Sequence, residues 1–280
     1  MFFKTIFFLV VFTVCSNALL AQVKIAGVII DKKTKKPVEY VNLGIANQGV
    51  GTVCNEDGKF ELTIPENLRA STITISRIGY KSSTLDIYKI EGEFSKLKIE
   101  LQENVISLNE VNVLATDEVQ LGQQPDGLRV KGMFKASALG LECGTLIKNK
   151  GRVRINDFSF NVLKVPFDSL RFRLNFYSVK NERPFEKINT KNILFNIAKR
   201  DTGLVRVDIA DDYIEVTDNF ICTIELVHTY GAKEKEAEFI FSAKPDTKGS
   251  VHKKAISMGA WEKVKPYSLC FWFIGNKYRK

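Results

Sequence analysis

The chain is poor in the residues that most often carry catalysis or bind metals. Its 280 residues include two histidines, two tryptophans and five cysteines. A zinc peptidase needs two histidines and a carboxylate around one metal, commonly with a glutamate three residues after a histidine. Neither His228 nor His252 is followed by such a glutamate. We therefore predict no metal site, no cofactor and no catalytic residue of this kind.

Other catalytic patterns are missing as well. The sequence has no Gly-x-Ser-x-Gly elbow, and the stretch 140–144, which contains two glycines, lacks the Lys-Ser/Thr pair of a phosphate-binding loop. No cysteine has a nearby histidine in sequence to activate it. A triad assembled from distant residues is an alternative that the sequence leaves open. We expect a non-enzymatic protein, and a hydrolase is the least favoured hypothesis.

The cysteines do not form a disulfide pattern. Cys15 falls in the N-terminal stretch that we expect to be removed, and Cys54 is then alone in the first half of the chain. At most one bridge can form within the second half, among Cys143, Cys222 and Cys270. Cys222 shares the parity of the apolar residues in 220–226, and we interpret it as a small core residue. The spacing matches no zinc site.

The first 21 residues have the order of an export signal. Lys4 precedes an apolar core over 5–14, and small residues lead up to Ala21, after which we expect cleavage. A buried N-terminal helix or strand is the alternative. A lipoprotein is disfavoured because Val14, which is not small, precedes Cys15. No later apolar run reaches the roughly 20 residues of a membrane span, so we predict a protein of the periplasm, the outer membrane or the cell surface.

The basic charge is dispersed. The net charge is +9, and the lysines fall into separate turns at 32–36, 148–150 and 253–254 and at the C-terminal end. A basic balance can favour nucleic acid or anionic surfaces, but no amphipathic helix gathers these lysines on one face. We predict solvated charge and no nucleic-acid partner.

Short apolar runs separated by turn residues occupy the chain from residue 22 to about 115. The runs are 25–30, 41–45, 60–64, 71–75, 97–101 and 111–113, and Asp57-Gly58 marks a tight turn. Alternation of apolar and polar residues with turns at short intervals predicts a half-buried antiparallel β-sandwich. We therefore assign residues 22–115 to a first domain.

Spaced glycine, proline and aspartate residues in this domain form a recognisable pattern. They occur in Gly27-Val28, Asp31, Lys36-Pro37-Val38, Gly51-Thr52, the run 55–60 and the run 75–80. The pattern resembles the carboxypeptidase regulatory-like domain, a transthyretin-like or Ig-like β-sandwich, in the form found at the front of Bacteroidetes envelope proteins. Residues 108–113 are similar to the segment that follows this domain in TonB-dependent outer-membrane transporters. The resemblance implies an accessory domain and not the peptidase itself, and 280 residues leave no room for a transporter's plug and barrel.

A second, larger β-domain is predicted behind a linker. The linker covers 116–127, where Gly122, Pro125 and Gly127 stand among polar residues, and the second domain covers 128–280. With 172–177 and 203–209 as its most distinctive runs, it looks like a β-domain that follows the regulatory-like domain in other Bacteroidetes proteins and has no established activity. Alternating runs predict a jelly-roll-like sandwich and an all-β protein; they are 155–162, 170–177, 193–197, 204–209, 220–227, 238–243 and 269–274.

One polar row is the main candidate site. If Leu170 and its alternating apolar neighbours face the core, Arg171, Arg173, Asn175 and Tyr177 project from the opposite face. Such a row suits a carboxylate or a sugar, but alternation alone also predicts an ordinary solvated face.

Two further groups have ordinary alternatives. Asp208, Asp211 and Asp212 could offer oxygen ligands to Ca²⁺, but their spacing matches no calcium loop and acidic turns are common. Trp261 and Trp272 could form a sugar-stacking platform, although the apolar neighbours of Trp272 favour a core position.

The combined prediction is an exported, non-enzymatic binding or interaction protein of the cell envelope. Its first domain would dock within the envelope, and its second would recognise a glycan, a peptide or a protein through unidentified residues. The alternative is a structural or assembly component with no small ligand.

Overall fold

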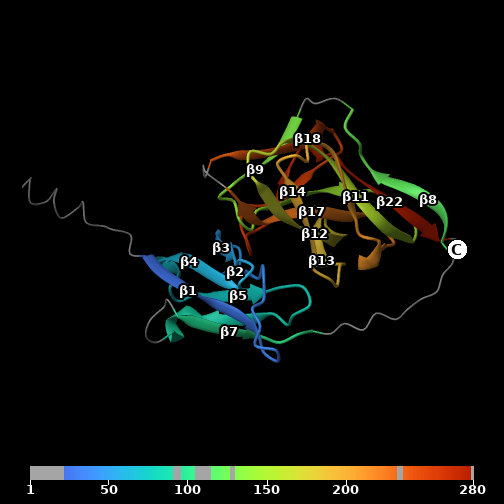
Figure 1. Ribbon diagram of the computed structural model, residues 1–280. Coiled ribbons are helices and arrows are strands. Elements are labelled where there is room, and N and C mark those ends of the chain that lie inside the picture. Colours follow the sequence, from blue (N-terminus) through green and yellow to red (C-terminus); the bar gives the residue numbers. More distant parts are fainter. Residues whose placement is uncertain (1–21, 91–95, 105–114, 127–129, 232–235, 279–280) are drawn as a thin grey trace, which may run out of the picture.

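The protein consists of two β-sandwich domains that lie side by side (Figure 1). The computed structural model describes residues 22–90, 96–104, 115–126, 130–231 and 236–278. Strands dominate these ranges, together with three short 3-10 helices. No helix in the described ranges is long and apolar enough to cross a membrane. The predicted all-β architecture is confirmed.

The first domain is built from two small sheets. One has the order β4-β1-β7, with β1 antiparallel to β4 and parallel to β7, and the other has the order β3-β2-β5-β6. The elements are β1 (Gln22–Asp31), β2 (Asn42–Ile45), β3 (Val50–Val53), β4 (Lys59–Pro65), η1 (Glu66–Leu68), β5 (Thr72–Ser76), β6 (Ser83–Asp86), η2 (Ile87–Lys89) and β7 (Leu97–Leu101).

Strand β4 shows how the sequence pattern produces this domain. Phe60, Leu62 and Ile64 are buried and join one apolar core with residues of both sheets, whereas the residues between them face solvent. The turn before β4 depends on Gly58, whose φ is 71°. A Cβ at this position would lie 2.4 Å from the carbonyl oxygen of Ile29, so glycine is required for two reasons.

The second domain is a larger sandwich of a seven-stranded and an eight-stranded sheet. The first sheet contains the path β13-β12-β17-β10-β19-β20 with β14 beside β12, and the second contains β21-β18-β11-β22-β8 with β15 and β16 beside β11 and β9 beside β18. The elements are β8 (Ala115–Gly122), β9 (Val130–Lys135), β10 (Glu142–Ile147), β11 (Val153–Lys164), β12 (Ser169–Lys180), β13 (Arg183–Lys187), β14 (Ile193–Ala198), β15 (Gly203–Asp208), η3 (Ala210–Asp212), β16 (Ile214–Val216), β17 (Phe220–Tyr230), β18 (Glu238–Pro245), β19 (Val251–Lys254), β20 (Glu262–Val264), β21 (Tyr267–Leu269) and β22 (Phe271–Tyr278).

Phenylalanine fills the space between these two sheets. Phe158 contacts the rings of Phe160, Phe195, Phe271 and Phe273 at centroid separations of 5.1 to 6.1 Å. Cys222 is buried in the same core, as its parity predicted. The four cysteines in the described ranges are all free and buried.

Three features differ from the sequence predictions or lie beyond them. The assignment of residues 116–122 to a linker is wrong. Residues 115–122 form β8, which pairs with β22 and belongs to the second domain. The predicted run 269–274 is divided at Cys270 between β21 and β22, which pair with different neighbours. The predicted strand 111–113 lies outside the described residues.

Candidate functional site

The polar row of β12 is largely buried, and its two arginines contact the first domain. Arg173, Asn175 and Tyr177 are 1%, 0% and 5% exposed, and Arg171 is half-buried. The alternate residues of the strand face the phenylalanine core, as the alternation predicted. The row therefore exists, but its solvated-face interpretation is wrong for three of its four members.

Four charged residues form a line across four neighbouring strands of the seven-stranded sheet. Strand pairing places Arg173 opposite Glu225, Glu225 opposite Glu142, and Glu142 opposite Lys254. We call this set the charge ladder. Its two ion pairs measure 3.0 Å from Arg173 Nη1 to Glu225 Oε2 and 2.7 Å from Lys254 Nζ to Glu142 Oε2. The ladder has no net charge, which makes its burial tolerable.

Neutral donors satisfy much of the remaining capacity of the two carboxylates. Glu142 Oε1 accepts hydrogen bonds from Asn175 Nδ2 and Tyr177 Oη, each at 2.9 Å, and from the Thr223 hydroxyl. Asn175 Nδ2 also lies 3.3 Å from Glu225 Oε2. The rest of the polar row thus binds carboxylates of its own chain.

Neighbouring charges set the protonation of this cluster. Burial raises the pKa of Glu142, but Lys254, Lys187 and a hydrogen bond from Thr223 outweigh it and lower the pKa to about 2. Burial lowers the pKa of Lys187 to about 8, against the opposing effect of Glu142 and Glu225. Although the stem of Lys187 is exposed, its ammonium group lies 3.1 Å from Asn175 Oδ1. Glu142 can therefore remain ionised within this buried cluster.

The first domain binds this cluster mainly through Tyr40 and Asn42. Asn42 Nδ2 donates to Glu225 Oε1 at 2.8 Å, and Asn42 Oδ1 accepts from Arg173 Nη1 at 3.0 Å. The Tyr40 carbonyl oxygen accepts a hydrogen bond from Arg173 Nη2, and the Tyr40 hydroxyl accepts one from Arg171 Nη1 at 3.0 Å. The arginines of β12 thus hold the main chain and the side chain of one residue of the first domain.

Tyr40 adopts a backbone conformation that is uncommon for a residue with a side chain. Its φ is 51°, and it is fully buried with Val53 and with Val227 of the second domain. The Cys54 thiol helps to fix this segment: its sulfur accepts from the Val41 N–H at 3.0 Å and donates to the Val38 carbonyl oxygen at 3.2 Å. The contacts around Tyr40 keep it in this strained conformation, so we infer that Tyr40 is important for the contact between the two domains.

The loop between β19 and β20 forms a second connection. The Met258 carbonyl oxygen accepts a hydrogen bond from the Asn47 N–H at 2.9 Å. Cβ atoms at Gly44 and Gly51 would lie 2.7 and 2.2 Å from the Ser257 carbonyl oxygen, so two glycines of the first domain allow this loop to approach.

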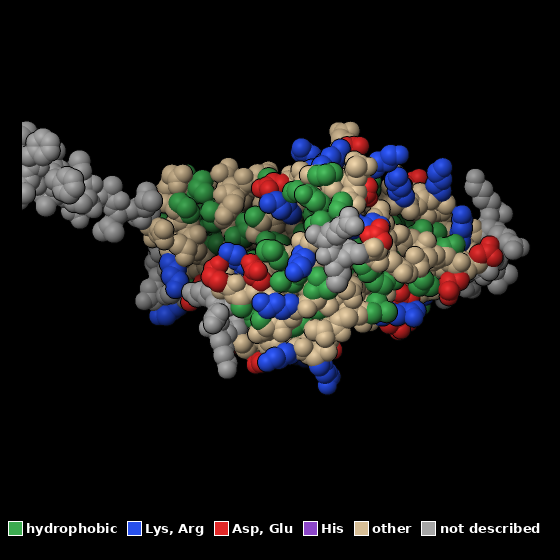
Figure 2. All heavy atoms as spheres, turned by 90° about the horizontal axis from the view of Figure 1, so that it is seen from above, with side chains coloured by type: hydrophobic (Ala, Val, Ile, Leu, Met, Phe, Trp, Pro, Cys, Tyr) green, Lys and Arg blue, Asp and Glu red, His purple; other side chains and the backbone are tan. Residues whose placement is uncertain are grey.

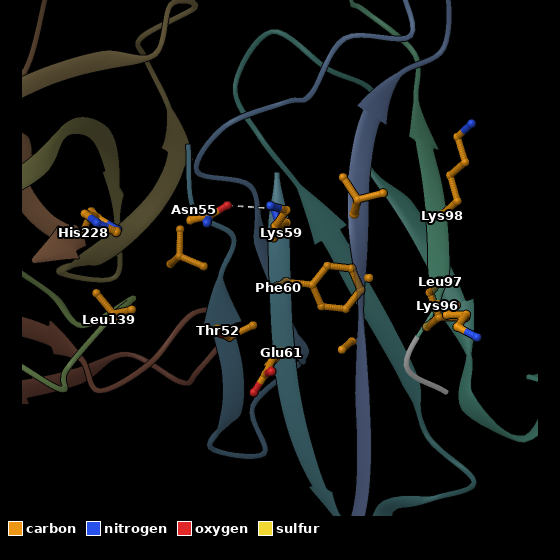
Figure 3. A pocket seen from close by; sticks show the side chains of 14 residues that line it. Thr52, Asn55, Lys59, Phe60, Glu61, Lys96, Leu97, Lys98, Leu139 and His228 are labelled. Atoms are coloured by element: carbon orange, nitrogen blue, oxygen red, sulfur yellow. Dashed lines mark hydrogen bonds between the residues drawn. The ribbon is translucent and has the colours of Figure 1, made fainter. Parts of the chain in front are cut away.

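A groove of about 660 Å³ lies beside this interface and is lined by both domains. The first domain contributes strands β1, β4 and β7 and the segment 52–55, and the second contributes Leu139 and His228 (Figure 3). Ala26 and Val28 supply small apolar surface, whereas Lys59, Glu61 and Lys98 bring both signs of charge. Its chemistry is that of a binding surface with apolar and polar contacts side by side.

The histidines occupy separate places. His228 borders the groove with its ring 4.3 Å from that of Tyr230; burial lowers its pKa, so the ring is neutral at pH 7. His252 is buried on β19, with Nε2 3.0 Å from the Ser250 hydroxyl, and burial lowers its pKa to about 4. Strand pairing places Arg171 opposite His228 and Gly144 opposite His252, so these histidines stand at different positions of the sheet.

The remaining candidates are not assembled into sites. Asp208 caps the Ala210 N–H at 3.0 Å, and no group of three or more potential metal ligands occurs in the described part of the chain. Trp261 contacts the Tyr177 ring at 5.6 Å and lies under Lys254, next to the seven-stranded sheet. Trp272 is 8% exposed on β22 of the other sheet, so the two tryptophans do not make a shared platform.

On one face of the molecule the surface charge is dispersed, as the sequence predicted. On the face drawn in Figure 2, lysine and arginine side chains are interspersed with acidic ones over both domains. Several are paired, as in Lys35–Glu100 at 2.7 Å and Lys253–Glu262 at 3.1 Å.

Sequence reasoning missed the partners of the polar row. Glu225 stands inside a strongly apolar strand, and a lone acid there signals a buried partner. Glu142 follows a loop and gives no such signal, and Asn42 and Tyr40 lie more than 100 positions away in another domain. Strand register, which brings these residues together, was not available from the pattern.

Comparison with known proteins identifies the first domain alone. No curated protein matches the chain significantly. The cysteine protease and lectin-like domains of Cwp84, a surface layer associated protein of Clostridium difficile, align with a TM-score of 0.40 and 9% identity over 85% of this chain. The infectious bursal disease virus Gx strain structure aligns with a TM-score of 0.27 and 8% identity over 94% of this chain. This chain covers 58% and 57% of those chains, and such scores are too low to describe its fold further. Residues 25–113 match the family model of the CarboxypepD_reg-like domain, and the β-sandwich of the described part of the first domain fits that family.

Proposed function

We propose that this chain is an exported, non-enzymatic binding protein of the bacterial cell envelope and that its ligand occupies the groove between the two domains. The observation that carries the proposal is that the groove has walls from both domains, whose separation is fixed by the charge ladder and by Tyr40. A site whose walls are held in place loses little entropy when a ligand binds.

The lining favours an extended ligand with apolar and polar groups. Ala26 and Val28 offer a flat apolar strip on β1, and Lys59, Glu61 and Asn55 border it. Lys59 and Glu61 are already paired with Asp57 and Lys24 at 3.3 and 2.8 Å, so they provide directional contacts without an uncompensated charge. A peptide or glycan segment of the envelope has this mixture of groups.

Binding is tested with the full chain after removal of residues 1–21. Glycan arrays and peptide libraries are screened, and each positive is repeated with Ala26→Trp, which fills the groove. We expect the affinity to fall at least about tenfold, which corresponds to the loss of roughly 1.4 kcal/mol of binding free energy. Thr63→Trp is the matched control, because Thr63 is exposed on the same sheet and outside the groove. Equal loss in both variants would refute the groove as the site.

Other outcomes decide between the remaining functions. If no glycan or peptide binds and the chain co-purifies with an envelope scaffold, a structural or assembly role replaces ligand binding. Hydrolase activity that disappears in His228→Ala or His252→Ala would contradict the non-enzymatic part. For export, N-terminal sequencing of the secreted protein is expected to start at Gln22.

A further inference from the structure

A second cavity, of about 350 Å³, lies within the second domain and is separate from the groove. It is formed where the end of β8, the end of β10, the turn after β18 and strand β21 meet. Its lining includes Gln123, Lys148, Asp246, Lys248 and Ser268, with Leu121 and Leu146 as apolar surface. None of these residues belongs to the groove or to the charge ladder.

Asp246 holds the walls of this cavity in place. Its Oδ2 accepts hydrogen bonds from Gln123 Nε2 at 3.0 Å and from the Ser268 hydroxyl at 2.9 Å, and its Oδ1 accepts from the Lys248 N–H at 3.0 Å. Burial raises the pKa of Asp246, but these hydrogen bonds outweigh it and lower the pKa, so the group is a carboxylate at neutral pH. Because most of its acceptor positions are occupied by groups of its own chain, Asp246 positions the walls of the cavity and does not contact a ligand.

Close backbone contacts make the same walls rigid. A Cβ at Gly249 would lie 2.1 Å from Ser268 Oγ, and a Cβ at Gly122 would lie 2.2 Å from the Phe271 carbonyl oxygen. The Gln123 N–H donates to that same carbonyl oxygen at 2.9 Å. The cavity is therefore formed in advance of binding.

Two kinds of unused polar group remain at this cavity. The ammonium groups of Lys148 and Lys248 have no ion-pair or hydrogen-bond partner in the described ranges. Gln123 Oε1 is buried and accepts no hydrogen bond from any described residue. This acceptor has no accessible surface, so a ligand in the cavity does not reach it, and recognition depends on the two lysines and the apolar lining. The cavity thus offers the cations of two exposed lysines and small apolar patches.

We propose that this cavity binds an acidic sugar, with the carboxylate of the sugar between Lys148 and Lys248. The C–H face of the ring would contact Leu121 and Leu146. Charge-assisted hydrogen bonds to a carboxylate are the strong contacts of such a site. A neutral sugar lacks the group for the lysines, and a simple inorganic anion lacks the body that fills the cavity.

The test measures binding of glucuronate, glucose and sulfate to the full chain by calorimetry and by NMR chemical shifts. We expect glucuronate to bind better than either of the others, and its affinity to fall at least about tenfold in Lys148→Gln/Lys248→Gln. Lys33→Gln/Lys36→Gln removes the same charge from an exposed turn of the first domain and should leave binding unchanged.

Each contrary result overturns a stated part. Glucose that binds as well as glucuronate refutes recognition of the anion, sulfate that binds as well refutes recognition of the sugar, and an unaffected lysine double variant refutes the site. Glucuronate binding should also survive Ala26→Trp, so this inference and the groove proposal fail independently.

Discussion

Arg173 is the residue whose removal should do most damage to the assembly of the two domains. Its guanidinium group donates hydrogen bonds to Glu225 and Asn42 at 3.0 Å each, to Asn192 at 2.7 Å, and to the Tyr40 carbonyl oxygen. Two of these acceptors lie in the first domain and two in the second. Arg173→Leu keeps most of the packing volume and removes all four hydrogen bonds.

The cost follows from what the substitution leaves behind. Glu225 is 0% exposed and would retain only the amide donors of Asn42 and Asn175. Removing one partner of a buried ion pair typically costs about 3–5 kcal/mol because the other charge remains buried. We expect Arg173→Leu to lower the free energy of unfolding by this amount. Arg173→Leu/Glu225→Leu should recover part of the loss, since neither charge is then left unpaired.

The assay combines urea denaturation with small-angle X-ray scattering. The midpoint reports stability, and an increase in the radius of gyration reports separation of the domains. Arg171→Leu is the matched control on the same strand and face. Arg171 is half-buried and donates hydrogen bonds to Tyr40 Oη at 3.0 Å and to Asn196 Oδ1 at 2.8 Å. Arg171→Leu should therefore lower the free energy of unfolding by about 1 kcal/mol. If Arg173→Leu costs no more than Arg171→Leu and leaves the radius unchanged, the charge ladder does not hold the domains together.

Three further predictions test local features. The pKa of Glu142 in the folded protein is about 2, below its ordinary value of 4.5. Its contribution to stability is therefore present above pH 4.5 and is lost as the pH falls through 2. Glu142→Gln should flatten this part of a plot of the urea midpoint against pH. Gly58→Ala should lower the melting temperature more than Gly49→Ala does. Both glycines have a positive φ, but a Cβ at Gly49 meets open space. Equal losses of melting temperature would contradict the steric argument. Burial raises the pKa of the thiols of Cys54, Cys143, Cys222 and Cys270. These thiols should therefore not react with a thiol-exchange reagent such as DTNB until the chain unfolds. Fast labelling of the folded protein would contradict this prediction.

The fold could be predicted because its signal is local. Alternation places Phe60, Leu62 and Ile64 on one face of β4 without knowledge of any other strand. The same rule located β12 and the two faces of its residues. It failed at residues 115–122, where polar residues and a glycine suggested a linker. That strand is polar because it pairs along one edge with β22 and presents much of its surface to solvent.

The candidate site could be predicted only in part, since its residues meet through strand register and domain contact. The sequence showed that Arg173 projects away from the core, but not that β17 places Glu225 opposite it. Nor did it show that Asn42, 131 positions earlier, completes the pair. A polar residue on the outer face of a strand has the same local pattern whether water or another domain covers it.

This contact changes how the function of the chain has to be tested. Replacing the arginines of β12 would abolish binding if they contacted a ligand, but the same result follows if their loss separates the two walls of the groove. Ala26→Trp avoids this ambiguity, because Ala26 lines the groove on β1, whereas Tyr40 and Asn42 make the hydrogen bonds from the first domain to the charge ladder. A ligand that Ala26→Trp excludes binds in the groove. If the same ligand still binds Arg171→Leu at a normal radius of gyration, Arg171, the one row residue that is not buried, does not recognise it.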